Sequence, residues 1–212
     1  MNITQALSGY STQPLTHQLL MWLLKDYKRP NDKVHSLLTT GILSPVKKGL
    51  YIAGPAVKAT KPEPFTLANH ILGPSYISMD AALSYYGLIA ERVFEITSMT
   101  TKASRTFKTP EGIFSYTHLA LPYYSFGIRQ EQVADEQFVM MASPEKALFD
   151  KVLTTSGIIF RSPINVLDYL VDDLRIDEDS LKELDTNVMA SWLPDTPKKE
   201  TFKMIIKVLN KL

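Results

Sequence analysis

The apolar residues in the first quarter of the chain follow first a helical and then a strand-like spacing. Leucines recur three and four residues apart within residues 16–27, and a second helical stripe within residues 31–40 stops at Gly41. Residues 42–52 are largely apolar but are interrupted at Lys47-Lys48-Gly49, where the glycine allows the positive φ of a tight hairpin. Two helices followed by a hairpin with a basic tip are typical of a winged helix-turn-helix.

The remainder of the chain is predicted to form a second domain. Prolines cluster between residues 54 and 64 and indicate a linker, so we expect domains at 1–58 and 65–212. Alternation with a period of two predicts a small antiparallel sheet over about residues 93–141. Helical stripes follow over residues 143–212, with single helices expected at 163–174 and 180–192. The predicted fold class is α+β, an N-terminal winged helix-turn-helix followed by a mixed domain with a small antiparallel sheet and a helical C-terminal part.

Charge is divided unevenly along the chain. The 23 basic and 22 acidic residues give a net charge of +1, which by itself offers no sign of a nucleic-acid partner. Residues 1–60, however, hold seven basic and two acidic groups, whereas residues 131–212 hold ten and fifteen. Such asymmetry is expected when one small domain faces an anionic partner. The positive charge therefore coincides with the predicted winged helix.

Composition excludes several other classes of protein. The chain has no cysteine, which removes disulfide frameworks, thiolate nucleophiles and cysteine-ligated zinc. Its longest apolar run, Leu19 to Leu24, is too short to span a bilayer, and the N-terminus lacks the basic start of a signal peptide. We expect a cytoplasmic protein without a membrane-spanning segment.

The sequence contains few features of a catalytic site. No glycine-rich phosphate loop and no nucleophile elbow occurs, and the four histidines lack the spacing of zinc ligands. Lys146 and Asp150 are four residues apart on a predicted helix and are interpreted as a surface ion pair. We expect no enzyme, no metal and no cofactor. A weaker option is an enzyme in which Glu145, Lys146 and Asp150 line a pocket.

The polar face of the second predicted helix and the hairpin tip form a candidate DNA interface. Short hydrogen-bonding side chains on a helix can reach base edges in the major groove, while lysines contact phosphates. The candidate DNA-binding residues are Lys33, His35, Ser36, Thr39, Thr40, Lys47 and Lys48. Since the excess positive charge precedes the linker, we expect DNA contacts to be confined to the residues before the linker. The alternative is a winged-helix module that contacts a partner protein and not DNA.

Three segments carry a resemblance to a known family. Gly41-Ile42-Leu43 precedes Lys47-Lys48-Gly49-Leu50-Tyr51; Tyr76-Ile77-Ser78 leads through Ala81-Ala82-Leu83 to Tyr86-Gly87-Leu88; and Ala142-Ser143-Pro144-Glu145-Lys146-Ala147-Leu148-Phe149-Asp150 follows. In order and separation these segments resemble the AbiEi family of type IV antitoxins, with its Gly-Leu-Tyr wing, its Tyr-Ile-Ser helix and its Pro-Glu-Lys-Ala-Leu-x-Asp segment. The motif residues of the second domain are Tyr76, Ser78, Pro144, Glu145, Lys146 and Asp150.

The resemblance implies a transcriptional regulator from a toxin-antitoxin system that acts in abortive infection. Its N-terminal domain would bind operator DNA upstream of its own operon and repress transcription. Its larger domain would counteract a nucleotidyltransferase-like toxin without a stable complex, so direct contact is not assumed. Helix capping explains Ser143, Pro144 and Glu145 structurally, and Lys146 is the motif residue that capping explains least.

Overall fold

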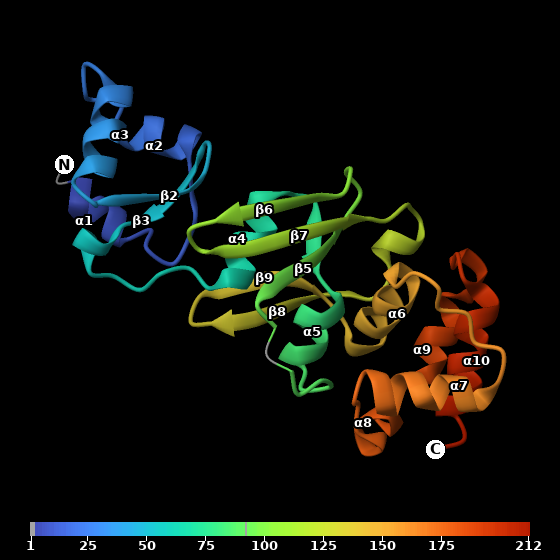
Figure 1. Ribbon diagram of the computed structural model, residues 1–212. Coiled ribbons are helices and arrows are strands. Elements are labelled where there is room, and N and C mark those ends of the chain that lie inside the picture. Colours follow the sequence, from blue (N-terminus) through green and yellow to red (C-terminus); the bar gives the residue numbers. More distant parts are fainter. Residues whose placement is uncertain (1–2, 92) are drawn as a thin grey trace.

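The N-terminal part combines three helices with a three-stranded sheet. The computed structural model describes residues 3–91 and 93–212. The elements of the first part are α1 (Ile3–Ser8), β1 (Leu15–Thr16), α2 (His17–Leu23), α3 (Pro30–Thr39), β2 (Leu43–Lys47) and β3 (Leu50–Ala53). The strands are antiparallel in the order β1-β3-β2. These elements lie together at one end of the molecule (Figure 1).

Local sequence explains where these elements begin and end. Thr16 caps α2, its hydroxyl accepting from the Leu19 N–H at 3.2 Å. Pro30 occupies the first turn of α3, where the missing N–H costs nothing. Gly41 after α3 has φ +68°, and Gly49 in the hairpin has φ +81°, so both turns use the conformation that favours glycine.

A six-stranded sheet forms the middle of the molecule, and its strand order is β6-β7-β5-β4-β9-β8. The strands are β4 (Ser75–Ile77), β5 (Glu95–Thr100), β6 (Arg105–Thr109), β7 (Gly112–His118), β8 (Ile128–Ala134) and β9 (Gln137–Ala142). The pairs β5·β7 and β4·β9 are parallel, whereas the other three are antiparallel. The expectation of a small antiparallel sheet over 93–141 is therefore wrong, because the sheet is mixed and also takes in β4.

Helices flank this sheet and fill the other end of the molecule. They are α4 (Pro64–Ile71), α5 (Met79–Tyr85), α6 (Pro144–Thr154), α7 (Pro163–Leu167), α8 (Glu178–Lys182), α9 (Thr186–Ser191) and α10 (Lys199–Leu209), with a π-helical turn at Asp168–Asp173 and short 3₁₀ turns at Pro55–Val57, Tyr123–Ser125 and Leu193–Asp195. The expectation of a single helix at 180–192 is wrong. Asp185 interrupts it, because its carboxylate caps α9 by accepting from the N–H groups of Asn187 and Val188. With these helices and the two sheets, the described chain belongs to the α+β class.

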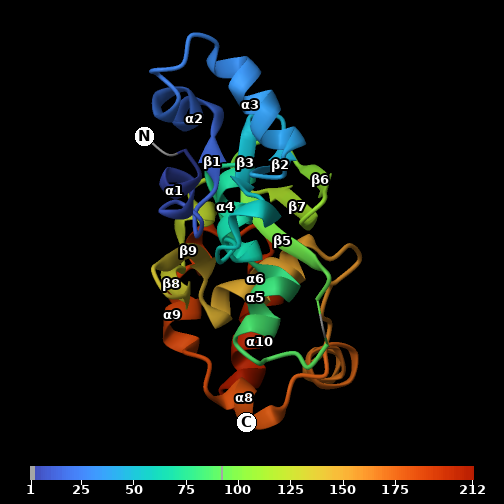
Figure 2. The same ribbon diagram turned by 90° about the vertical axis from the view of Figure 1, so that its left-hand side faces the viewer.

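The part before the proline-rich linker has an apolar cluster of its own, which includes Leu20, Leu24 and Leu37, but this part also contacts the rest of the chain. Val46, Leu50 and Ile52 of the β2–β3 hairpin are buried in the same apolar cluster as the central sheet and its helices. In Figures 1 and 2 the hairpin lies beside β6 and β7. An ion pair between Lys61 and Glu111, 3.4 Å long, also connects the linker to the β6–β7 turn. The N-terminal part is therefore packed against the sheet.

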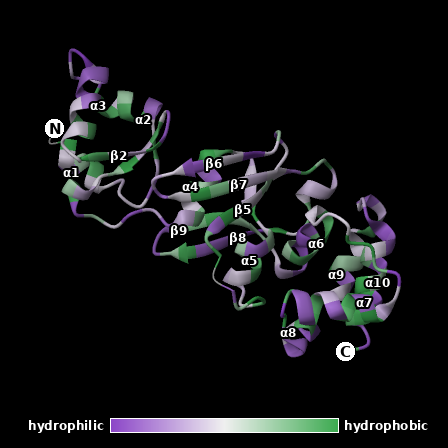
Figure 3. Cartoon of the chain, viewed as in Figure 1, coloured by the Kyte–Doolittle hydropathy of each residue, from purple (hydrophilic) through white to green (hydrophobic). Residues whose placement is uncertain are grey.

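Apolar and polar residues are distributed differently over the sheet and the N-terminal part. Figure 3 shows apolar residues along the central strands, while the turn that leads into α3 is hydrophilic. No helix within residues 3–91 and 93–212 has the length and apolar character needed to cross a membrane.

Candidate nucleic-acid interface and motif cluster

The outer face of α3 carries the polar residues expected there. His35, Ser36 and Thr39 are exposed, whereas Val34 and Leu37 on the inner face are buried. The helical period therefore separates the two sets as the sequence predicts. Thr40, directly after the helix, is also exposed, and Lys33 is half-buried.

Hydrogen bonds within α3 decide what its hydroxyl groups offer to a partner. Thr39 Oγ1 donates to the carbonyl oxygen of His35 at 2.9 Å, and Thr40 Oγ1 donates to that of Ser36 at 2.8 Å. Because a hydroxyl has one hydrogen and two lone pairs, both threonines present acceptors outward. The side chains of Ser36 and His35 form no hydrogen bond within the described chain, so their polar atoms remain available to a partner. The face thus offers a partner both hydrogen-bond acceptors and hydrogen-bond donors.

The two hairpin lysines differ in their surroundings. Lys48 is exposed at the tip, whereas Lys47 is half-buried. The ammonium of Lys47 lies 5.7 Å from the ring centroid of Phe107 in β6. The guanidinium carbon of Arg105, also in β6, lies 4.8 Å from the same centroid. Sequence reasoning missed Arg105, since only the docking of the hairpin on the sheet places it beside Lys47.

Further basic and aromatic groups lie near α3 and were also missed. Trp22 is 58% exposed, and the Lys25 ammonium lies 5.7 Å from its ring centroid. The Lys33 ammonium lies 5.4 Å from the ring centroid of Tyr27. A large aromatic residue on the polar side of a predicted helix was the available signal for Trp22.

Four of the six motif residues of the second domain lie together, because three of them contact the carboxylate of the fourth, Asp150. Tyr76 in β4 donates its hydroxyl to Asp150 Oδ2 at 2.9 Å, and Ser78 donates its own to the same oxygen at 2.7 Å. The Lys146 ammonium lies 2.9 Å from Asp150 Oδ1. All four side chains are fully buried. We refer to Tyr76, Ser78, Lys146 and Asp150 as the motif cluster.

Lys146 has further partners that compensate for its burial. Its ammonium donates to the Tyr123 carbonyl oxygen at 3.0 Å and lies 3.3 Å from the Tyr123 ring centroid. Burial lowers the pKa of Lys146, and attraction to Asp150 opposes that shift. Burial beside the Asp150 carboxylate raises the pKa of Tyr76 far above its ordinary range, so Tyr76 remains a donor.

The interpretation of Lys146 and Asp150 as a surface ion pair is wrong, because neither side chain has any exposed area. The spacing of four residues is the same for a buried pair as for a surface pair. The distinguishing signal is the intervening Ala147-Leu148-Phe149, which makes α6 apolar on more than one face. Without exposed atoms, this pair cannot touch a substrate in the described conformation.

The start of α6 confirms the capping expectation. Ser143 Oγ accepts from the Lys146 N–H at 3.3 Å, and Pro144 lies in the first turn. Glu145 is buried as well; its Oε1 accepts from the Asp185 N–H at 3.2 Å, and its Oε2 lies 3.9 Å from Arg129. Glu145 therefore connects α6 to the beginning of α9.

The remaining candidates for chemistry are sparse among the described residues. No group of three or more histidine, aspartate or glutamate side chains there is arranged to hold a metal ion. A cavity of about 340 Å³ is lined by Glu145, Arg129 and Glu183, among others, but not by Lys146 or Asp150. The three residues of the weaker enzyme option thus do not share a pocket.

Comparison with known proteins identifies a fold and not a family. No protein-family model matches the chain, and no curated protein matches it significantly. The crystal structure of the RV2827C protein from Mycobacterium tuberculosis is similar, with a TM-score of 0.57 and 16% sequence identity over 97% of this chain and 80% of that chain. At that identity the likeness concerns the fold alone, and it spans both the N-terminal part and the rest.

Proposed function

We propose that this protein is a DNA-binding transcriptional regulator and the antitoxin of a type IV, AbiE-like toxin-antitoxin system. The observation that carries the proposal is the exposed hydrogen-bonding face of α3 beside a hairpin with a lysine at its tip. A helix that presents short polar side chains, with lysines nearby, has the chemistry for base edges and phosphates together. The protein would act in the cytoplasm, where the operator DNA is found.

Residues 1–58 act as a winged helix in this proposal. Their order of helix, strand, two helices and two strands, with the antiparallel sheet β1-β3-β2, supports that assignment. α3 would enter the major groove, where His35, Ser36, Thr39 and Thr40 meet base edges. Lys33 and the hairpin residues Lys47 and Lys48 would contact phosphates and set the position of the helix.

The experiment for this proposal separates base recognition from phosphate contact. Binding of the protein to duplex DNA from upstream of its own gene is measured by fluorescence anisotropy, with a shuffled duplex of equal length as reference. Ser36→Ala and His35→Ala should reduce the preference for the upstream duplex by about 1–3 kcal/mol if each makes a base contact. They should leave the salt dependence unchanged, because neither removes a permanent charge.

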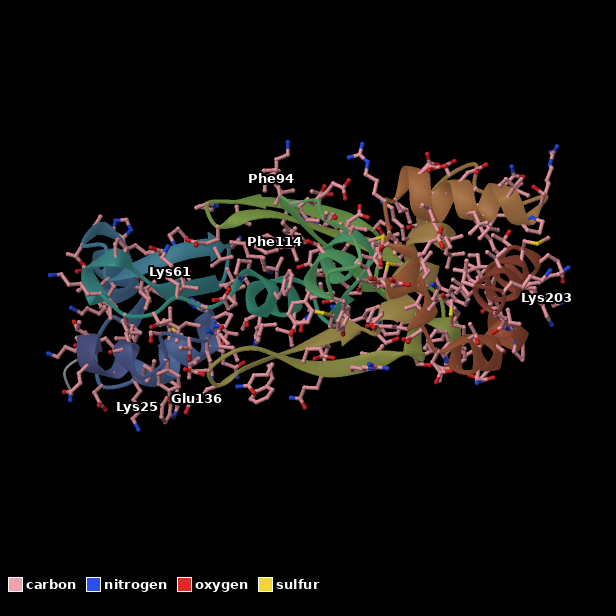
Figure 4. All side chains as sticks on the ribbon, turned by 90° about the horizontal axis from the view of Figure 1, so that it is seen from below. Lys25, Lys61, Phe94, Phe114, Glu136 and Lys203 are labelled. Atoms are coloured by element: carbon pink, nitrogen blue, oxygen red, sulfur yellow. The ribbon has the colours of Figure 1, made fainter. Side chains whose placement is uncertain are left out.

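Lys203→Gln is a matched control for surface substitutions. Lys203 is an exposed residue in α10, and Figure 4 places it at the end of the molecule opposite Lys25 and Lys61. Its replacement should alter neither the affinity nor the preference. If the wild-type protein binds both duplexes equally, or neither, the proposed recognition by α3 is refuted.

The antitoxin part of the proposal rests on the resemblance of the three segments and has its own test. A nucleotidyltransferase-like gene next to this one would be expressed alone and together with this protein, and growth would be followed. Restored growth is expected with the wild-type chain. Failure to restore growth, with both proteins present at normal levels, would remove the antitoxin role and leave the DNA-binding role standing.

A second candidate function is a protein-interaction module that does not bind DNA. The exposed Trp22, 58% accessible, and Tyr27, 38% accessible, favour it because large aromatics are enriched at protein interfaces. Co-purification of a stoichiometric partner protein, lost on Trp22→Ala, together with no binding of the upstream duplex, would support this candidate over the first.

A further inference from the structure

Two positive charges from distant parts of the chain share one aromatic ring. The Lys47 ammonium lies 5.7 Å and the Arg105 guanidinium 4.8 Å from the Phe107 ring centroid. Lys47 comes from the hairpin before the linker, and Arg105 comes from β6, an edge strand of the central sheet. We call Lys47, Arg105 and Phe107 the basic seam.

The basic seam lacks a neutralising acid. Within residues 3–91 and 93–212, neither Lys47 nor Arg105 forms an ion pair. Glu111, the first acidic residue after β6, pairs instead with Lys61 at 3.4 Å. Two like charges within about a Debye length repel each other, and the ring quadrupole offsets that repulsion only in part. An anion bound between them would relieve it.

Packing holds the basic seam in place. Val46, next to Lys47, is buried in the central apolar cluster with Leu50 and Ile52. The Phe107 ring packs edge to face on Tyr116, with centroids 5.7 Å apart, and Tyr116 donates its hydroxyl to the Ala68 carbonyl oxygen at 2.6 Å. The strands that carry the two cations are therefore held by packing, and an anion bound there would not have to order a loop.

We propose that Arg105 extends the DNA-binding surface across the linker, so that Lys47 and Arg105 contact the phosphates of one duplex together. This inference rests on the proposed function, because the hairpin with Lys47 and Lys48 supplies the neighbouring part of the same surface. It revises the expectation that DNA contacts end before the linker. The partner is the duplex phosphate backbone, so Arg105 should add affinity without sequence preference.

Lys108 provides a matched control on the same strand. Adjacent strand residues point to opposite faces, so Arg105 and Phe107 share one face of β6 while Lys108 lies on the other. Lys108 is exposed and carries the same charge as Arg105. Arg105→Gln and Lys108→Gln thus remove one charge each from the same edge strand, but only the first removes it from the basic seam.

The test measures binding of the upstream duplex by anisotropy at several salt concentrations. Arg105→Gln should weaken binding about tenfold at 0.1 M salt and lower the slope of log affinity against log salt by about one. Lys108→Gln should leave the slope within error of the wild type, and Arg105→Lys should restore most of it because the charge returns. Thermal melting checks that each variant remains folded.

The outcomes distinguish this inference from the proposed function. If the wild type binds and Lys47→Ala with Lys48→Ala lowers the slope, but Arg105→Gln does not, the inference is overturned and the proposed function stands. Equal loss of slope at Arg105 and Lys108 overturns the assignment to the basic seam, since it indicates a general charge effect. If the wild type does not bind duplex DNA at any salt concentration, the proposed function fails and the inference fails with it.

Discussion

The β2–β3 hairpin with Lys47 and Lys48 and the motif cluster both contain charged residues, yet their environments are opposite. On the hairpin, Lys48 is exposed and Lys47 has an aromatic contact but no carboxylate. In the motif cluster, the Asp150 carboxylate accepts hydrogen bonds from two hydroxyl groups and forms an ion pair with one ammonium, and all four side chains are fully buried. A paired and dehydrated charge holds elements of the fold together, whereas an exposed and unpaired one remains available to a partner. The same residue types thus serve different purposes.

Asp150 provides the strongest test of the difference between the two regions. Asp150→Ala should lower the free energy of unfolding by about 3–5 kcal/mol, because it leaves the Lys146 ammonium buried without its counter-charge. The measurement is chemical denaturation followed by circular dichroism. The double variant Lys146→Met with Asp150→Leu should be more stable than Asp150→Ala, since no unpaired charge remains. If Asp150→Ala unfolds like the wild type, the motif cluster does not stabilise the fold.

Gly127 tests how tightly the chain closes around Lys146. Gly127 has φ +60°, and a Cβ there would lie 2.8 Å from both Lys146 Cβ and the Trp192 ring. Gly127→Ala should therefore cost about 2–4 kcal/mol, combining backbone strain with overpacking. Gly157 has φ +78° but open space around it, so Gly157→Ala is the control and should cost only about 1–2 kcal/mol. Equal losses at the two glycines would contradict the close packing.

Tyr76 tests a single hydrogen bond within the motif cluster. Tyr76→Phe removes one of the two hydroxyl donors to Asp150 Oδ2 while keeping the ring that packs against Tyr124. The expected loss is about 1–3 kcal/mol, because the acceptor is charged and buried. Tyr124→Phe should cost less, since no hydrogen bond from its hydroxyl is seen within the described chain. Denaturant titration of the two variants compares them directly.

The hairpin lysines should have the smallest effects on stability. Lys48→Ala should change the free energy of unfolding by less than about 0.5 kcal/mol. Lys47→Ala should cost about 0.5–1 kcal/mol, because it removes the contact with the Phe107 ring. Thermal denaturation of both variants measures the difference between their stabilities. A larger loss at Lys48 than at Lys47 would mean that the hairpin tip, and not its base, is packed against the protein.

Sequence reasoning succeeded where local spacing determines structure. The stripe of Val34 and Leu37 gave the buried face of α3, and Ser143 with Pro144 gave the start of α6. It failed for β4, because three residues are too few for a period, and the strand exists through pairing with Met99 and its neighbours. These results reflect whether the deciding contact is near or far in sequence.

The same distinction between local and distant contacts decides which parts of the candidate sites could be predicted from the sequence. The polar face of α3 could be predicted from the helical period alone, and its exposure is confirmed, although its role in DNA binding remains a prediction. The burial of Lys146 and Asp150 could not be predicted from their spacing, since burial depends on β4 and the Tyr123 segment. Arg105 was missed because its proximity to Lys47 arises only from the packing of the hairpin against the sheet.

The salt dependence of DNA binding tests the central claim most directly. Affinity for the upstream duplex is measured from low to moderate salt for the wild type and for Lys47→Ala with Lys48→Ala. We expect the slope of log affinity against log salt to fall by about two in the double variant, one for each lost phosphate contact. Parallel lines with equal affinity would contradict the assignment of the hairpin to DNA.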